Sequence, residues 1–153
     1  MSLKQSWKKF VISGFIVFMV SLLYNGLVHG VLLKSSYDPI RHLLRDDMKQ
    51  KMPLSLLATL AISYLFVLNF TKWSKGKGIK EGIVYGIFFA LLIGLFVDVN
   101  QYVMYPLPAH IAAEWFVSGM IEFVMNGIIL SLIYKKAKEE NVQPIKITNL
   151  NTN

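Results

Sequence analysis

Four long apolar runs constrain this chain more than any other feature of its sequence. They cover residues 10–33, 53–71, 82–104 and 109–134. A helix needs about 20 apolar residues to cross a hydrocarbon core of roughly 30 Å, and each run has about that length. The hydrophobic share of 54% and the charged share of 16% also point away from a soluble domain. We therefore expect an all-α, polytopic membrane protein: a bundle of four transmembrane helices in contact with the lipid bilayer.

The first run resembles a secretory signal peptide in one respect, because three lysines precede it. It is longer than the apolar core of a signal peptide, and no small-residue cleavage pattern follows it. We expect it to be retained as the first span. Residues 1–138 should then form a single four-helix domain. The polar residues 139–153 should form a disordered cytoplasmic tail, because they carry no apolar periodicity.

Lys and Arg are distributed unevenly among the segments that flank the runs. The N-terminus, the second connection and the tail together carry eleven, whereas the first connection carries five and Tyr105–Pro108 carries none. Cytoplasmic flanks of membrane proteins are enriched in these residues, so both termini should be cytoplasmic. The net charge of +7 is then mainly an orientation signal, and we expect no nucleic-acid partner.

The first connection carries the pattern of a short amphipathic helix. Asp38 and Pro39 suit the N-cap and the first position of a helix. Apolar residues then recur at helical spacing with charged residues between them: Ile40, Leu43, Leu44 and Met48. We expect this helix to lie on the extracytoplasmic surface of the membrane, either as an interfacial anchor or as a lid over the bundle.

Small residues recur every four positions in two of the runs, and such ridges let helix backbones approach closely. The longer ridge is in the third run: Gly82, Gly86, Ala90 and Gly94. The first run contains Gly26 and Gly30 at the same spacing. We expect both sets to be helix-packing faces, used either within the bundle or in a homo-oligomer or larger membrane complex.

Polar side chains inside the runs form the candidate functional site, because ionisable groups in hydrocarbon are costly and usually functional. The candidates are Asn25, His29, Asp98, His110, Glu114, Glu122 and Asn126. Those on the fourth run step by four residues, as do the two on the first, so each set lies on one helix face. At about 1.5 Å per residue, Glu122 lies near the bilayer midplane and His29, Asp98 and Glu114 lie roughly 9–12 Å outside it. We expect the polar stripes to face inward together.

The spans contain three acids but no Lys or Arg, so something else must balance the carboxylates. Protonated Glu122 can donate to Asn25 or Asn126. Water can enter from outside, with Lys34 or Arg41 reaching down. A divalent cation can bind to four residues whose nitrogen and oxygen atoms are suitable metal ligands: His29, Asp98, His110 and Glu114.

Some of these residues also have purely structural interpretations. His29 can be a packed side chain bonded to a backbone carbonyl or to Asp98, and Asp98 can mark the interfacial end of the third span. Asp98 with Glu114 is the one pairing that resembles a catalytic carboxylate dyad. The chain has no cysteine, and we expect neither an enzyme nor a cofactor.

Two segments resemble a known group of proteins. One is Leu27–Lys34 with Tyr37 and Arg41 after it, and the other joins Pro106–Pro108 to residues 113–123. Over residues 10–135 the chain resembles small four-helix bacterial integral membrane proteins of unknown function. The resemblance implies the fold, the topology and a bacterial inner (cytoplasmic) membrane, and it implies no catalytic or binding role.

Two functions of different kinds fit these features. The first is a small binding or transport module whose buried acidic and histidine side chains take up protons or cations. The alternative is an accessory or structural subunit that docks on another membrane protein through its small-residue ridges, with the buried polar groups fixing helix register.

Overall fold

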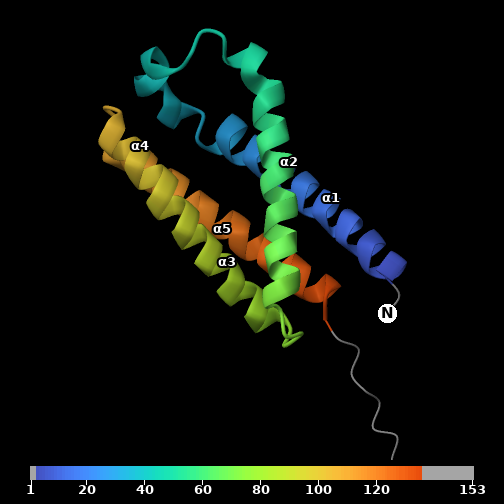
Figure 1. Ribbon diagram of the computed structural model, residues 1–153. Helices are drawn as coiled ribbons and strands as arrows, with labels where there is room; N and C mark the ends of the chain where they lie inside the picture. The colour runs from blue at the N-terminus through green and yellow to red at the C-terminus, as the bar shows by residue number, and fades with distance from the viewer. Residues whose placement is uncertain (1–2, 136–153) are drawn as a thin grey trace, which may run out of the picture.

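The computed structural model describes residues 3–135 of the chain, and every regular element among them is helical (Figure 1). In chain order the elements are α1 (Leu3–Leu27), η1 (Val28–Leu32), η2 (Ser35–Leu43), α2 (Met48–Trp73), α3 (Ile79–Ile93), η3 (Gly94–Asp98), α4 (Val99–Met104) and α5 (Ala109–Ile133). The turns η1 and η3 are π-helical and continue α1 and α3 without a break, whereas η2 is a 3₁₀ helix. The predicted tail, residues 139–153, lies outside the described residues.

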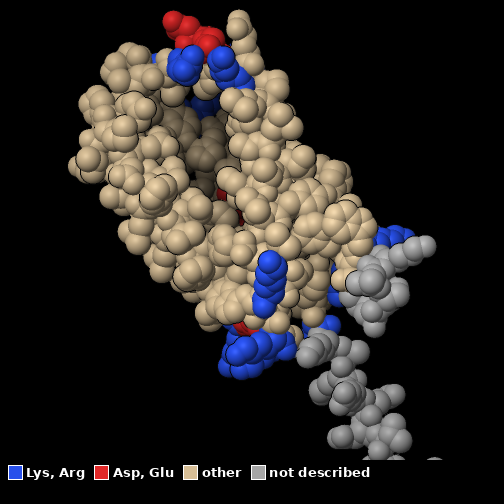
Figure 2. Space-filling view, viewed as in Figure 1, with Lys and Arg blue, Asp and Glu red and all other residues tan. Residues whose placement is uncertain are grey.

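Four helical stretches in the described part of the chain are long and apolar enough to cross a membrane. They are Ser6–Leu32, Met48–Trp73, Ile79–Met104 and Ala109–Ile133. They coincide with the four predicted runs, so the prediction of an all-α protein with four spans is confirmed. Figure 2 shows Lys and Arg gathered mainly toward the two ends of the bundle, as expected for a membrane protein.

The helix predicted in the first connection is present, but its position differs. It begins at Ser35 rather than at Asp38, and Pro39 lies inside it. Proline has no N–H and clashes with the preceding turn of an α-helix, so a short 3₁₀ helix accommodates it better. Of the predicted apolar face, Ile40 is buried, whereas Met48 already belongs to α2. The amphipathic segment is therefore shorter than the sequence pattern predicts.

The small-residue ridge of α3 packs against α5. A Cβ atom at Gly82 would meet the backbone of Gly127, and a Cβ atom at Gly86 would meet the Phe123 carbonyl and the Cα of Val124. Glycine is required at these positions because the two helix backbones touch. This part of the predicted helix-packing face is therefore used within the chain.

The rest of the α3 ridge is packed, whereas the small residues of the first run are not. Ala90 is buried, and a Cβ atom at Gly94 would meet the ring of Phe116 on α5. In contrast, a Cβ atom at Gly26 or Gly30 would meet nothing within 4 Å. The expectation of close packing at Gly26 and Gly30 therefore does not hold within this chain.

The apolar core lies toward the end of the bundle that carries the α2–α3 turn, residues 74–78. Its buried side chains come from all four long helices: Val17, Phe66, Val67, Phe70, Tyr85 and Leu130. The hydroxyl of Tyr85 donates to the carbonyl oxygen of Phe66 at 2.6 Å, which ties α3 to α2. Nearby, the ring of Tyr64 on α2 packs over Gly14 of α1. The helices are thus held together most closely at this end, called the turn end below.

The opposite end, which carries η2, is open on one side. Residues 48–58 of α2 are all exposed, so about three turns of this helix pack against no other element. Figure 1 shows α2 crossing in front of the other helices and diverging from α3 toward this end. Figure 2, in the same view, shows the resulting hollow between α2 and the side formed by α3 and α4. The long helices that lie behind this hollow are α1 and α5.

The contrast between Gly86 and Gly30 gives a direct test of this packing. Gly86→Ala should destabilise the protein by about 1–3 kcal/mol, because its methyl group would overlap the backbone of α5. Gly30→Ala should be neutral or slightly stabilising, since it adds a helix-favouring residue in open space. Reversible unfolding in detergent or bicelles measures both. Equal effects of the two substitutions would show that α3 and α5 do not approach as closely as described.

Candidate functional site

Hydrogen bonds between side chains of α1 and side chains or carbonyls of α5 run along most of the bundle, and we call this contact the α1–α5 seam. Its pairs are Ser13 with Tyr134, Ser21 with Asn126, Asn25 with Glu122, and Tyr24 with Ser118, with donor–acceptor distances of 3.0–3.3 Å. The predicted polar stripes of the first and fourth runs therefore do face each other. Hydrocarbon offers these groups no other partner, so the pairs fix the register of the two helices.

Glu122 and Asn25 form the ionisable pair of the seam. The amide nitrogen of Asn25 donates to Oε2 of Glu122 at 3.0 Å and to the carbonyl oxygen of Ser21 at 2.9 Å. The amide thus uses both of its N–H groups. The hydroxyl of Ser21 also lies within reach of the Glu122 carboxyl. Two polar side chains of α1 therefore hold this carboxyl against α5.

Asn126 does not pair with Glu122, although both lie on the same stripe. Its side chain is buried at 2% exposure, and its nitrogen donates to Oγ of Ser21 at 3.0 Å. Its Oδ1 atom is enclosed and has no hydrogen-bond partner among the described residues. An unpaired buried carbonyl costs about 1–3 kcal/mol. Of the two partners proposed for Glu122, Asn25 is the one that the structure places beside it.

At the η2 end, the polar contacts tie the 3₁₀ helix to the bundle. The Tyr37 hydroxyl accepts a hydrogen bond from Nε1 of Trp115 at 2.9 Å and also contacts Nδ1 of His29. Burial and the nearby charge of Glu114 raise the pKa of Tyr37, although the Trp115 hydrogen bond opposes this, so the hydroxyl keeps its proton. Because its oxygen already accepts from Trp115, that proton is available to Nδ1 of His29, which is the arrangement of a neutral imidazole.

Glu114 is held at the same end. Oγ of Ser36 donates to its Oε1 at 3.1 Å, while its Oε2 is enclosed without a partner among the described residues. Neither Ser36 nor the pair of Tyr37 and Trp115 was among the sequence candidates, because a search for titratable groups inside the spans passes over hydroxyls and indoles. The sequence signal that could have indicated Tyr37 and Trp115 is their residue type, because Tyr and Trp are enriched at membrane interfaces.

Asp98 and His110 do not join this arrangement. Asp98 lies at the end of η3 and makes no hydrogen bond or ion pair with a described residue, so His29 is bonded to Tyr37 and not to Asp98. The Asp98 carboxylate stays beside the small-residue ridge, because a Cβ atom at Gly94 would lie 3.5 Å from its Oδ2. His110 is exposed near the start of α5.

A divalent cation, one of the three ways considered to balance the acids, finds no prepared site among the described residues. In residues 3–135 no group of three or more His, Asp or Glu side chains is arranged to hold a metal ion. His110 and Glu114 line one cavity, but His29 and Asp98 are not part of its lining. Residue type and depth do not fix the direction of a side chain around a helix.

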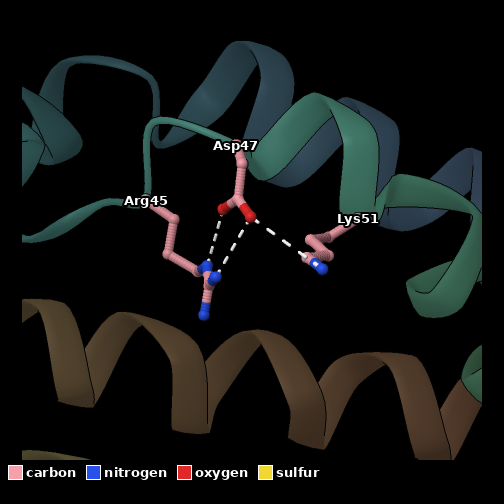
Figure 3. A network of polar contacts seen from close by, with 3 residues as sticks. All are labelled: Arg45, Asp47 and Lys51. Atoms are coloured by element: carbon pink, nitrogen blue, oxygen red, sulfur yellow. Dashed lines mark hydrogen bonds and ion pairs between the residues drawn. The ribbon is translucent and has the colours of Figure 1, made fainter.

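The basic residues of the first connection are engaged at the surface. Arg41 pairs with Asp38 at 2.9 Å, and Asp47 accepts two hydrogen bonds from Arg45 at 2.7 and 3.1 Å, with Lys51 at 3.9 Å (Figure 3). The Arg45 guanidinium lowers the pKa of Asp47. These pairs are exposed and contribute little stability. Arg41 thus does not reach down to the carboxylates of the spans.

The hollow between α2 and the side formed by α3 and α4 also contains acidic groups. Figure 2 shows acidic atoms visible inside it, below a rim that carries Lys and Arg of the first connection. None of the ion pairs formed by the described residues includes an acid of the spans. The acids of the spans therefore have no basic counter-charge among the described residues.

No protein-family model matches this chain, and neither does a curated protein or a solved structure. The four helices that are long and apolar enough to span a membrane agree with the general resemblance to small four-helix membrane proteins. No family is identified for this chain.

Proposed function

We propose that the protein is a small binding module of the membrane in which Glu122 takes up a proton or a small cation from the hollow beside α2. The observation that carries this proposal is the state of the Glu122 carboxyl. Asn25 on the neighbouring helix holds Oε2, and none of the ion pairs of the described residues gives this carboxyl a basic partner. The histidines and the other acids of the spans are not part of the proposed site.

The electrostatics of the spans support this proposal. An ionised carboxylate near the bilayer centre costs several kcal/mol unless a counter-charge or water stabilises it. No described basic side chain supplies that charge. A proton or a small cation can supply it. Asn25 then positions the group in either state, because an amide beside a carboxyl can donate or accept.

Infrared titration of the protein in lipid nanodiscs tests the proposal. The carbonyl stretch of a protonated carboxylic acid should appear and disappear as the pH is changed. This signal should be lost in Glu122→Gln, which keeps the shape of the side chain but cannot ionise. Asp98→Asn is the matched control, because it also removes an acid of the spans but leaves the α1–α5 seam intact.

Two outcomes would contradict the proposal. One is a signal that Glu122→Gln leaves unchanged. The other is a signal that Asp98→Asn and Glu122→Gln reduce equally, because the titration would then report span acids in general.

The alternative function, a subunit that docks on another membrane protein, has one observation in its favour. Gly26 and Gly30 form an open small-residue face that no part of the described chain covers. A docked helix would bury this face, so Gly26→Leu should abolish co-purification of a partner while leaving the Glu122 titration unchanged. Retained co-purification in that variant would exclude this face as the docking site.

We also propose that the setting is a bacterial inner membrane with both termini in the cytoplasm. The support is the excess of Lys and Arg in the N-terminus, the second connection and the tail. The chain has no cysteine, so single-cysteine variants report topology cleanly. A membrane-impermeant maleimide should label Ser35→Cys on intact spheroplasts and Lys77→Cys only after permeabilisation. The reverse pattern would invert the topology.

A further inference from the structure

A second concavity lies between α1 and α5 at the η2 end, with a volume of about 430 Å³. Its apolar walls come from both helices at helical spacing: Val28 and Leu32 on one side, and Val117 and Ile121 on the other. Its polar lining includes Glu114 and His110. The volume falls within the roughly 300–1,000 Å³ typical of small-molecule sites.

Neither Glu122 nor Asn25 lines this cavity, although Tyr24 and Ser118 of the α1–α5 seam do. The walls belong to membrane-spanning segments, so the molecules that reach this cavity laterally are lipids. The cavity occupies the part of the spans next to η2, and thus one leaflet.

Glu114 determines what the cavity can hold. A carboxylate can accept about four hydrogen bonds, and Glu114 receives one, from Ser36, while its Oε2 is enclosed and unpaired. None of the described ion pairs includes it. The terminal torsion of a glutamate side chain is soft, so a small rotation presents Oε2 to the cavity. The group therefore lacks a cationic donor of hydrogen bonds.

The depth of Glu114 fits a lipid headgroup. It lies five residues after Ala109, so about 8 Å along α5 from its start. A helix of 25 residues is about 38 Å long and exceeds a hydrocarbon core of roughly 30 Å by a few ångströms at each end. Glu114 is thus only about 4 Å below the level where headgroups meet acyl chains.

We propose that this cavity binds a membrane lipid whose headgroup ends in a primary ammonium, with the ammonium on Glu114 and one acyl chain between α1 and α5. An ammonium brings the positive charge and the N–H donors that Glu114 lacks. A trimethylated ammonium brings the charge without the donors, and an anionic headgroup is repelled. The walls of Val28, Leu32, Val117 and Ile121 match the acyl chain.

Native mass spectrometry of the detergent-purified protein tests this site with three lipids of identical acyl chains: phosphatidylethanolamine, phosphatidylcholine and phosphatidylglycerol. The wild-type protein should retain phosphatidylethanolamine about tenfold more than the other two. Glu114→Gln should abolish that preference, and Asp98→Asn should keep it. Val117→Trp should reduce the binding of all three lipids, because the indole fills the cavity.

Equal retention of the three lipids by the wild-type protein would overturn the proposal, whether or not the variants fold. A preference that survives Glu114→Gln in folded protein would also overturn it, because the selectivity would then arise elsewhere. Neither result bears on the Glu122 titration, so the two proposals fail independently.

Discussion

The α1–α5 seam is the contact on which the rest of this structure depends. Close packing of apolar and small residues accounts for the pairing of α3 with α5 and for the core at the turn end, but lipid competes with protein for such contacts. Polar groups have no competing partner in hydrocarbon. The pairs of Ser21 with Asn126 and Asn25 with Glu122 therefore fix how α1, together with α2, is placed against α5. Each such hydrogen bond contributes about 0.6 kcal/mol on average and at most about 1.7.

The seam also divides the three acids of the spans into different environments. Glu122 lies in the seam with one oxygen held by Asn25, Glu114 is held by Ser36 at the η2 end, and Asp98 ends the π-helical turn beside Gly94. The three acids of the spans therefore differ in their partners. This difference is why we assign a proton or cation to Glu122, a lipid ammonium to Glu114, and no role to Asp98.

The sequence predicts the fold well because membrane insertion leaves few alternatives. Run length fixes the four spans, and the four-residue steps of polar and small residues correctly indicate the facing stripes of α1 and α5 and the packing of Gly82 and Gly86. The errors arise where the backbone departs from a regular helix. The third span contains an unpredicted π-helical turn before α4, and Pro39 lies within a 3₁₀ helix that begins earlier than predicted. Single-residue changes in helical geometry of this kind leave no clear periodic signal.

The possible metal ligands His29, Asp98, His110 and Glu114 also form no metal-binding group among the described residues. Residue type and depth can be read from the sequence, but rotation around each helix depends on packing with its neighbours. Tyr37 and Trp115 show the converse, because a residue between two spans and an indole within one complete the environment of His29. Sequence patterns therefore indicate which helices carry polar groups, whereas the partner of each group requires the structure.

The most direct test of the seam is a double-mutant cycle on Ser21 and Asn126, whose side chains are both buried. The free energy of unfolding would be measured in bicelles for Ser21→Ala, Asn126→Ala and the double variant. A hydrogen bond between α1 and α5 predicts a coupling energy of about 0.6–1.7 kcal/mol. Additive effects, within about 0.3 kcal/mol, would contradict the account, because α1 and α5 would then not be joined through this pair.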